Sequence, residues 1–210
     1  MTVKLSLTQF LTFKAKMSTS AKMNYLSTQV KYSNYTFYGD YWLPLRQRIQ
    51  QFANGKISAT ELLNYAENVP EDKNKRKNYV KDTRKFLNFV KTYKPTFFEV
   101  GKASWSYKDL LTISASPELG VITDSGNKYL LKIVYTLNKP NEKLMKQNIL
   151  PMLTMMDIAN KDFNVQNAIP AVLNLRNGRL IELDNSQNPG IGKKELLVDA
   201  QEILNIWDLI

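Results

Sequence analysis

The sequence predicts a mixed α+β fold, with a helical N-terminal domain followed by an α/β domain that has a small mixed sheet flanked by helices. Up to Pro95, apolar residues recur at the spacing of amphipathic helices. From Thr96 onward, short apolar runs are separated by turn sequences, which is typical of strands. We therefore expect a basic helical domain at residues 1–95 and an α/β domain at residues 96–210. The hydrophobic content of 43% is sufficient for a buried core.

Five helices are expected before Pro95, at residues 6–17, 20–30, 44–54, 59–68 and 72–94. Ser6 can cap the first helix, because its hydroxyl can accept a hydrogen bond from a free backbone amide. Ser58 and Glu61 form the clearest local signal, a capping box at the start of the fourth helix. The fifth helix carries an apolar stripe on one side and basic residues over most of the rest of its circumference.

Seven strands are expected after Pro95, at residues 96–100, 105–107, 110–113, 119–123, 128–137, 169–175 and 179–183. The stretch 128–137 is largely apolar at both alternating sets of positions, so we expect a central strand covered on both faces. Turns are predicted at residues 124–127 and at Asn177-Gly178. A helix should begin at Asn138 to Pro140, and a last helix at Lys193 after a polar loop over residues 184–192.

A dense group of aromatic residues precedes the third helix. We expect it to form a packed core or a seam between domains, because aromatic side chains dominate core burial. A surface on which unpaired bases stack is the alternative. The group consists of Tyr32, Tyr35, Phe37, Tyr38, Tyr41 and Trp42.

Two absent residue types exclude several classes of chemistry. The sequence contains no cysteine and no histidine, which rules out disulfides, thiolate ligands, histidine-ligated zinc, and Ser-His or Cys-His catalysis. Oxygen donors remain, and they suit Mg²⁺, Mn²⁺ or Ca²⁺. No apolar run approaches the about 20 residues of a membrane span, and Met1 to Leu11 is too polar for a secretory signal. We expect a cytoplasmic protein without a membrane partner.

The net charge of +10 is concentrated in the N-terminal part of the chain. Residues 1–95 hold 17 Lys or Arg against 6 Asp or Glu, whereas residues 96–210 hold 12 against 13. Such asymmetry indicates a polyanionic partner such as DNA or RNA. The excess of 23 Lys over 6 Arg fits the alternative, a surface kept soluble by lysine. The residues expected to contact nucleic acid are Lys73, Lys75, Arg76, Lys77, Lys81, Arg84 and Lys85.

These contacts are expected to be with phosphates rather than bases. The break at residues 69–75 is longer than the turn of a helix-turn-helix motif. No cluster of Arg, Asn or Gln marks a face that could read base edges. The basic helix therefore predicts a surface that positions nucleic acid without reading its sequence.

Three residues of the predicted hairpin are candidates for a catalytic site. Glu118 precedes the strand at 119–123, Asp124 lies in the turn, and Lys132 lies on the long strand. The order of hairpin, crossover helix and further strand resembles the core of the PD-(D/E)XK nuclease superfamily. In that family an acid on the second core strand, and an acid and a lysine two residues apart on the third, gather Mg²⁺ and the attacking water beside the scissile phosphate.

The resemblance implies roles for these residues. Glu118 or Asp124 would supply the first acid and a metal ligand, and Lys132 would match the motif lysine. Leu130 stands where the second acid would be, so the motif is degenerate. Each residue also has a plain interpretation: Asp124 caps its own turn, Glu118 is a solvent-facing edge residue, and Lys132 extends beside apolar neighbours to water.

We expect a nucleic-acid-associated, non-catalytic protein with a degenerate nuclease-like domain and no certain cofactor. Two alternatives stay open. One is a protein-interaction or scaffold module that binds a protein partner without nucleic acid. The other is a nuclease dependent on Mg²⁺ or Mn²⁺ that uses Glu118, Asp124 and Lys132 as catalytic residues, with Glu118 and Asp124 as metal ligands. The sequence leaves the oligomeric state open.

Overall fold

A computed structural model describes residues 2–32, 40–72, 74–135, 146–160, 167–184 and 189–210. The strands are β1 (Val3–Leu5), β2 (Thr96–Phe98), β3 (Ser104–Tyr107), β4 (Leu111–Ser114), β5 (Leu119–Ile122), β6 (Lys128–Val134), β7 (Ile169–Asn174) and β8 (Arg179–Glu182). The α-helices are α1 (Leu7–Lys14), α2 (Thr19–Leu26), α3 (Leu43–Ala53), α4 (Ala59–Asn68), α5 (Lys75–Tyr93), α6 (Lys146–Ala159) and α7 (Pro189–Leu209), and a π-helical turn follows α2 at Ser27–Lys31. The predicted mixed α+β class is confirmed.

The strands form two mixed sheets. The larger has the order β2-β5-β6-β7-β8, in which β5 is antiparallel to β2 and β6, β6 is parallel to β7, and β8 is antiparallel to β7. The segment between β6 and β7 contains α6. The smaller sheet has the order β1-β4-β3, with β1 parallel and β3 antiparallel to β4.

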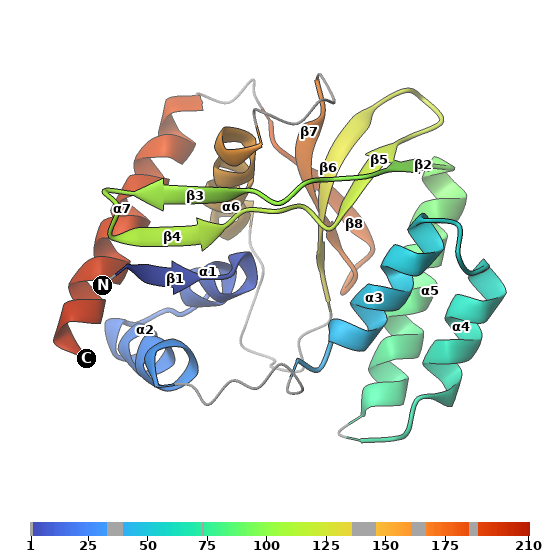
Figure 1. Cartoon of the computed structure of the whole chain (residues 1–210), viewed down its shortest axis with the longest axis horizontal. Coiled ribbons are helices and arrows are strands. Elements are labelled where there is room, and N and C mark those ends of the chain that lie inside the picture. The colour runs from blue at the N-terminus through green and yellow to red at the C-terminus, as the bar shows by residue number, and fades with distance from the viewer. Residues whose placement is uncertain (1, 33–39, 73, 136–145, 161–166, 185–188) are drawn as a thin grey trace.

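The larger sheet separates two groups of helices (Figure 1). Helices α3, α4 and α5 lie on one side, whereas the smaller sheet and α1, α2, α6 and α7 lie on the other. Strand β6 is buried on both faces, because Leu131 and Ile133 pack with the first group while Leu130 packs with the second. The prediction of a central, doubly covered strand is confirmed.

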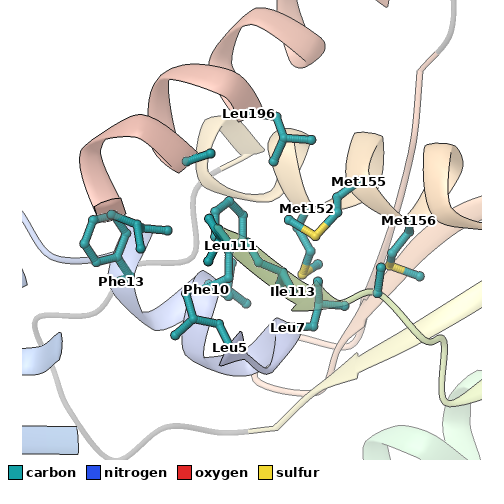
Figure 2. Close-up of a cluster of buried hydrophobic side chains, with 14 of the residues drawn as sticks. Leu5, Leu7, Phe10, Phe13, Leu111, Ile113, Met152, Met155, Met156 and Leu196 are labelled. Atoms are coloured by element: carbon teal, nitrogen blue, oxygen red, sulfur yellow. The ribbon is translucent and has the colours of Figure 1, made fainter. Parts of the chain in front are cut away.

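Each side of the larger sheet has its own hydrophobic core. Figure 2 shows the core on the α6 side, where Phe10 and Phe13 of α1 meet Ile113 of β4 and Met152 of α6. On the other side, Tyr79 and Phe86 of α5 pack with residues of α3, α4 and the sheet. Both cores combine residues from before and after position 95, so the predicted boundary does not separate two cores.

Short sequence signals, such as helix caps, predicted the positions of most helices and strands. Ser6 and Ser58 both form complete capping boxes, with Gln9 and Glu61 as the reciprocal partners. Helix α5 begins at Lys75, three residues later than predicted, and the seven expected strands appear with shifts of a few residues. The expected helix start at Asn138 to Pro140 lies outside the described residues.

Two further features were not predicted. Strand β1 was not expected, because the strand with which it pairs lies more than a hundred residues away: Val3 aligns with Leu111. The expected loop at residues 184–192 is shorter, since α7 begins at Pro189. Gly192 is therefore helical, and a Cβ there would overlap Thr154 of α6, so this glycine serves close helix packing.

Tyr41 and Trp42 of the aromatic group pack against the core on the α5 side, whereas Tyr32 is exposed. Trp42 stacks on Tyr79 and on Tyr135, with ring centroids 5.5 and 5.1 Å apart. Tyr41 contacts Trp42 edge-on at 4.8 Å. Tyr35, Phe37 and Tyr38 lie outside the described residues. Within the described ranges, no helix is both long and apolar enough to span a membrane.

Candidate functional site

The candidate site is built around an ion pair inside the β5–β6 hairpin. The backbone N–H of Glu118 donates a hydrogen bond to the carbonyl of Leu131 at 2.8 Å, which extends the pairing of β5 with β6. Glu118 thereby lies opposite Lys132, and directly opposed side chains share a face of the sheet. Lys132 Nζ donates to Glu118 Oε1. The two side chains are only 12% and 7% exposed, so this is a buried pair.

A second cation reaches the same carboxylate. Arg46, in the first turn of α3, has its Nε 3.4 Å from Glu118 Oε1. Its Nη1 lies 3.3 Å from Oδ2 of Asp40. The other oxygen of Asp40 accepts a hydrogen bond from the backbone N–H of Trp42 at 3.0 Å. We call Asp40, Arg46, Glu118 and Lys132 the charge network.

The charge network lies in the wall of a cavity of about 840 Å³, which we call the central cavity. Val134 and Asn174, at the carboxyl ends of the parallel strands β6 and β7, contribute to this wall. Helix α1 contributes Thr8 and Thr12. In open sheets that contain parallel strands, ligands commonly bind beyond the carboxyl ends of those strands. The volume falls within the range of about 300–1,000 Å³ that is usual for small-molecule sites.

Protonation in the cavity wall follows from burial and neighbouring charge. Burial acts to lower the pKa of Arg46, but the carboxylates of Glu118 and Asp40 outweigh it and leave the pKa above its ordinary value. Burial, together with the Glu118 charge, raises the pKa of Tyr135 well above its ordinary value. At neutral pH the wall therefore presents a guanidinium beside a neutral phenol. The charged residues of the described part of the wall are Arg46, Lys132, Arg176, Asp40 and Glu118.

Asp124 does not join this site. It is exposed in the β5–β6 turn, where its backbone N–H donates to the carbonyl of Tyr93 at 3.0 Å. Six residues of extended chain separate it from Glu118, which corresponds to about 20 Å. The three residues predicted to act together are therefore divided: Glu118 and Lys132 meet, and Asp124 lies at the opposite end of the hairpin.

The charge network does not fit a divalent cation. Glu118 is the one predicted metal ligand present, and its Oε1 is already bonded to Lys132 with Arg46 close by. Leu130, at the position of the second acid, is buried in the core. Among the described residues, no group of three or more His, Cys, Asp or Glu side chains gathers around a common point. Two adjacent cations would repel Mg²⁺ or Mn²⁺, so we derive no metal-dependent step here.

Five of the seven basic residues predicted to contact nucleic acid lie on the outer side of α5. A shallow groove of about 550 Å³ runs along this side. Its wall includes Arg76, Lys77, Lys81, Arg84 and Lys85, which we call the basic stripe. Lys75 is turned toward the aromatic core, with Nζ 5.9 Å from the ring centre of Tyr41. Lys73 lies outside the described residues.

Two residues of α5, Asn78 and Lys85, lie near residues of the cavity wall or of a turn that contributes to it. Tyr41 lines the cavity, and its hydroxyl accepts a hydrogen bond from Nδ2 of Asn78 on α5 at 2.9 Å. At the other end, a Cβ on Gly178 in the β7–β8 turn would lie 3.4 Å from the side chain of Lys85. Arg176, in the same turn, lines the cavity.

Sequence reasoning missed half of the charge network. Arg46 and Asp40 carry no motif, and the contact of Arg46 with Glu118 joins positions 72 residues apart along the chain. A proline such as Pro44 marks the first turn of a helix, so the sequence placed Arg46 near the start of α3. The proline therefore predicts that Arg46 lies on a helix, but it does not predict that the guanidinium lies beside Glu118.

Comparison of the chain with protein-family models, with curated protein sequences and with solved structures finds no match. The interpretation of the site therefore rests on its own geometry.

Proposed function

We propose that the protein binds DNA or RNA through the basic stripe of α5, and that its α/β part is a nuclease-like core without a working catalytic site. The observation that carries the proposal is the one-sided distribution of charge on α5. Tyr79, Asp82 and Phe86 are fully buried on the inner side of this helix. Arg76, Lys77, Lys81 and Arg84 are exposed on the outer side. Clustered exposed cations along a helix are the electrostatic footprint of phosphate binding.

Glu71 shares the groove wall with the five cations of the stripe, which leaves the described wall positive. Glu67 lies 3.3 Å from Arg84, but both side chains are substantially exposed. Such surface pairs contribute at most about 1 kcal/mol, so a phosphate group can replace the carboxylate. Arg179, exposed at the start of β8, adds a further cation beyond the β7–β8 turn. The footprint thus extends past α5 itself.

The order of elements supports the nuclease-like part of the proposal. Helix α5 is followed by β2, then by β3 and β4 of the smaller sheet, and then by β5 and β6, which lie antiparallel beside β2 in the larger sheet; α6 and the parallel strand β7 come next. Glu118 and Lys132 meet where the resemblance places an acid and the motif lysine. Leu130 and the two cations around Glu118 argue against catalysis, because metal-assisted hydrolysis needs carboxylates free to hold the ion.

Salt-dependent binding tests the proposal. The full chain should bind a fluorescent oligonucleotide at about 50 mM salt, and its affinity should fall steeply as the salt concentration rises. Replacing Lys77, Lys81 and Arg84 with Gln should weaken binding and reduce the slope of log K against log salt by about 3. The matched control replaces three exposed lysines on other surfaces, Lys4, Lys102 and Lys193. Equal losses in both triple variants, or no binding at low salt, would refute the proposal.

A cleavage assay tests the non-catalytic part. Wild-type protein incubated with DNA or RNA in Mg²⁺ or Mn²⁺ should leave the substrate intact. Lys132→Ala is the control that separates intrinsic activity from contamination. Metal-dependent cleavage that disappears in Lys132→Ala would show that the site is catalytic, and cleavage that persists would point to a contaminating nuclease.

A further inference from the structure

Asn174, the last residue of β7, carries a donor that the described part of the protein leaves unused. The residue is 4% exposed and belongs to the wall of the central cavity. Its Oδ1 accepts a hydrogen bond from the backbone N–H of Arg176 at 3.0 Å, which distinguishes the oxygen of this amide from the nitrogen. Nδ2 donates to none of the described residues and keeps some accessible surface, which opens to the cavity. An almost buried donor without a partner indicates that a ligand supplies the acceptor.

The first turn of α1 contributes further donors to the same cavity. The first four backbone N–H groups of a helix have no acceptor within the helix. In α1 the side chain of Ser6 bonds the N–H of Gln9, and the carbonyl of Ser6 bonds the N–H of Phe10. The two amides that remain belong to Leu7 and Thr8, and both residues lie in the cavity wall. The positive end of the helix dipole adds to their preference for a negatively charged group.

The charged side chains of the wall also favour an anion. The three cations and two acids of the described wall leave one positive charge, and the side chain of Arg46 is 24% exposed. The oxygens of Asp40 face the N–H of Trp42 and the guanidinium of Arg46. Oε1 of Glu118 bonds to Lys132, and Oε2 is enclosed by the protein. Neither acid therefore presents an unpaired oxygen to a ligand.

The number of donors matches a phosphate group. Three elements supply them: α1 through its amides, α3 through Arg46 and β7 through Asn174. A phosphate monoester offers three acceptor oxygens, whereas a carboxylate offers two. The volume of about 840 Å³ exceeds what a phosphate fills, and Tyr41, Trp42 and Leu43 add apolar surface. An organic group attached to the phosphate therefore fits beside it.

We propose that the central cavity binds the phosphate group of a small molecule between the first turn of α1, the guanidinium of Arg46 and Nδ2 of Asn174. The site lies beyond the carboxyl ends of the parallel strands β6 and β7, where ligands of such sheets commonly bind. It goes beyond nucleic-acid binding by α5 and does not depend on it, because no residue of the basic stripe belongs to the described cavity wall.

Titration calorimetry of the full chain at constant ionic strength tests the site. The probes are inorganic phosphate, ribose 5-phosphate and acetate. Both phosphates should bind saturably, and acetate should bind at least about tenfold more weakly, because it has fewer acceptors and less charge. Tighter binding of ribose 5-phosphate than of phosphate identifies a phosphorylated organic molecule as the ligand, and equal binding identifies free phosphate. Acetate binding as tight as phosphate, or no phosphate binding up to about 10 mM, overturns the proposal.

Asn174→Asp is the most direct variant. It keeps the Oδ1 acceptor for the N–H of Arg176 but replaces the donor Nδ2 with an oxygen that shares a negative charge. Phosphate binding should weaken by more than about tenfold, because a charge-assisted hydrogen bond is replaced by repulsion. Asn177→Asp is the matched control, since Oδ1 of Asn177 accepts from the N–H of Arg179 at 3.1 Å in the same way. Asn177 lies outside the described wall, so its variant should keep the wild-type affinity.

A second pair of variants separates binding from folding. Thr8→Glu adds a negative charge to the first turn of α1, which stabilises a helix but repels a phosphate in the cavity. Phosphate binding should weaken about tenfold while the urea midpoint stays unchanged or rises. Thr19→Glu makes the same change in the first turn of α2, outside the described wall, and should bind phosphate as wild type does. Wild-type affinity in either cavity variant, or an equal loss in its control, overturns the site.

The basic stripe provides the comparison with the proposed function. The variant in which Lys77, Lys81 and Arg84 are replaced with Gln should lose oligonucleotide binding but keep the wild-type affinity for phosphate. A loss of phosphate binding in this variant would place the phosphate on α5 and overturn the cavity site. If the wild type binds phosphate but no oligonucleotide, the proposed function fails and the cavity site stands.

Discussion

Removing the Lys132 ammonium should show how much the charge network depends on a complete set of partners. Lys132→Met keeps the length and apolar stem of the side chain but removes the donor to Glu118 Oε1. The buried carboxylate then keeps one cation within reach, the guanidinium of Arg46 at 3.4 Å. The variant therefore leaves Glu118 partly, not wholly, uncompensated.

The size of the effect follows from burial. Exposed ion pairs contribute at most about 1 kcal/mol, whereas removing one partner of a buried pair costs about 3–5 kcal/mol. With 12% and 7% of the two side chains exposed, this pair belongs to the buried class. Because Arg46 still compensates part of the charge, we expect a loss of about 2 kcal/mol in the free energy of unfolding. The double variant Lys132→Met, Glu118→Met should recover most of that loss.

Urea unfolding followed by circular dichroism measures these values, provided that the denaturant slope stays constant across the variants. A double-mutant cycle then isolates the coupling between the two side chains. A coupling energy below about 0.5 kcal/mol would contradict the reasoning, because it would mean that the pair behaves like a solvent-exposed one.

Three other substitutions test separate parts of the fold. Ser58→Ala removes the cap of α4 and should lower the free energy of unfolding by about 1 kcal/mol in urea titrations. Gly120→Ala places a Cβ against the ring of Phe98 on β2 and should cost about 1–3 kcal/mol in the same assay, with no loss if the ring can move aside. Burial raises the pKa of Asp199 despite its ion pair with Lys14 at 2.5 Å. The folded protein therefore holds this proton more tightly than the unfolded chain, and this contribution to stability should decline as pH rises from about 4 through the raised pKa. Asp199→Asn should remove that decline, so the stability of wild type relative to the variant, measured from pH 3 to 7, should fall with increasing pH.

Elements defined by local chemistry were predictable from the sequence. The capping boxes at Ser6 and Ser58 act within four residues of chain, and the structure contains both. Both alternating sets of side chains in β6 are largely apolar. Because alternate side chains of a strand point to opposite faces of the sheet, this pattern predicted a central strand. The hairpin around Asn177-Gly178 also forms, with Asn174 opposite Arg179.

Features that depend on distant partners were not predictable. Strand β1 has three residues, and its pairing with β4 follows from tertiary packing rather than from its own pattern. The meeting of Glu118 with Lys132 followed from the hairpin, but the approach of Arg46 depends on how α3 packs on one side of the larger sheet. The sequence also indicated the basic side of α5 without showing that Lys75 turns toward Tyr41.

The pairing of β1 with β4 has a consequence for how the chain folds during synthesis. A ribosome releases Val3 to Leu5 long before Leu111 to Ile113 exist, and the core around Phe10 and Phe13 also needs α6 and α7. Until then these phenylalanines stay exposed to solvent and to chaperones. Contacts between such distant residues also slow folding, because a long loop must close before they form. Residues 3–5 thus reach their final positions only after residues 111–113 have been synthesised.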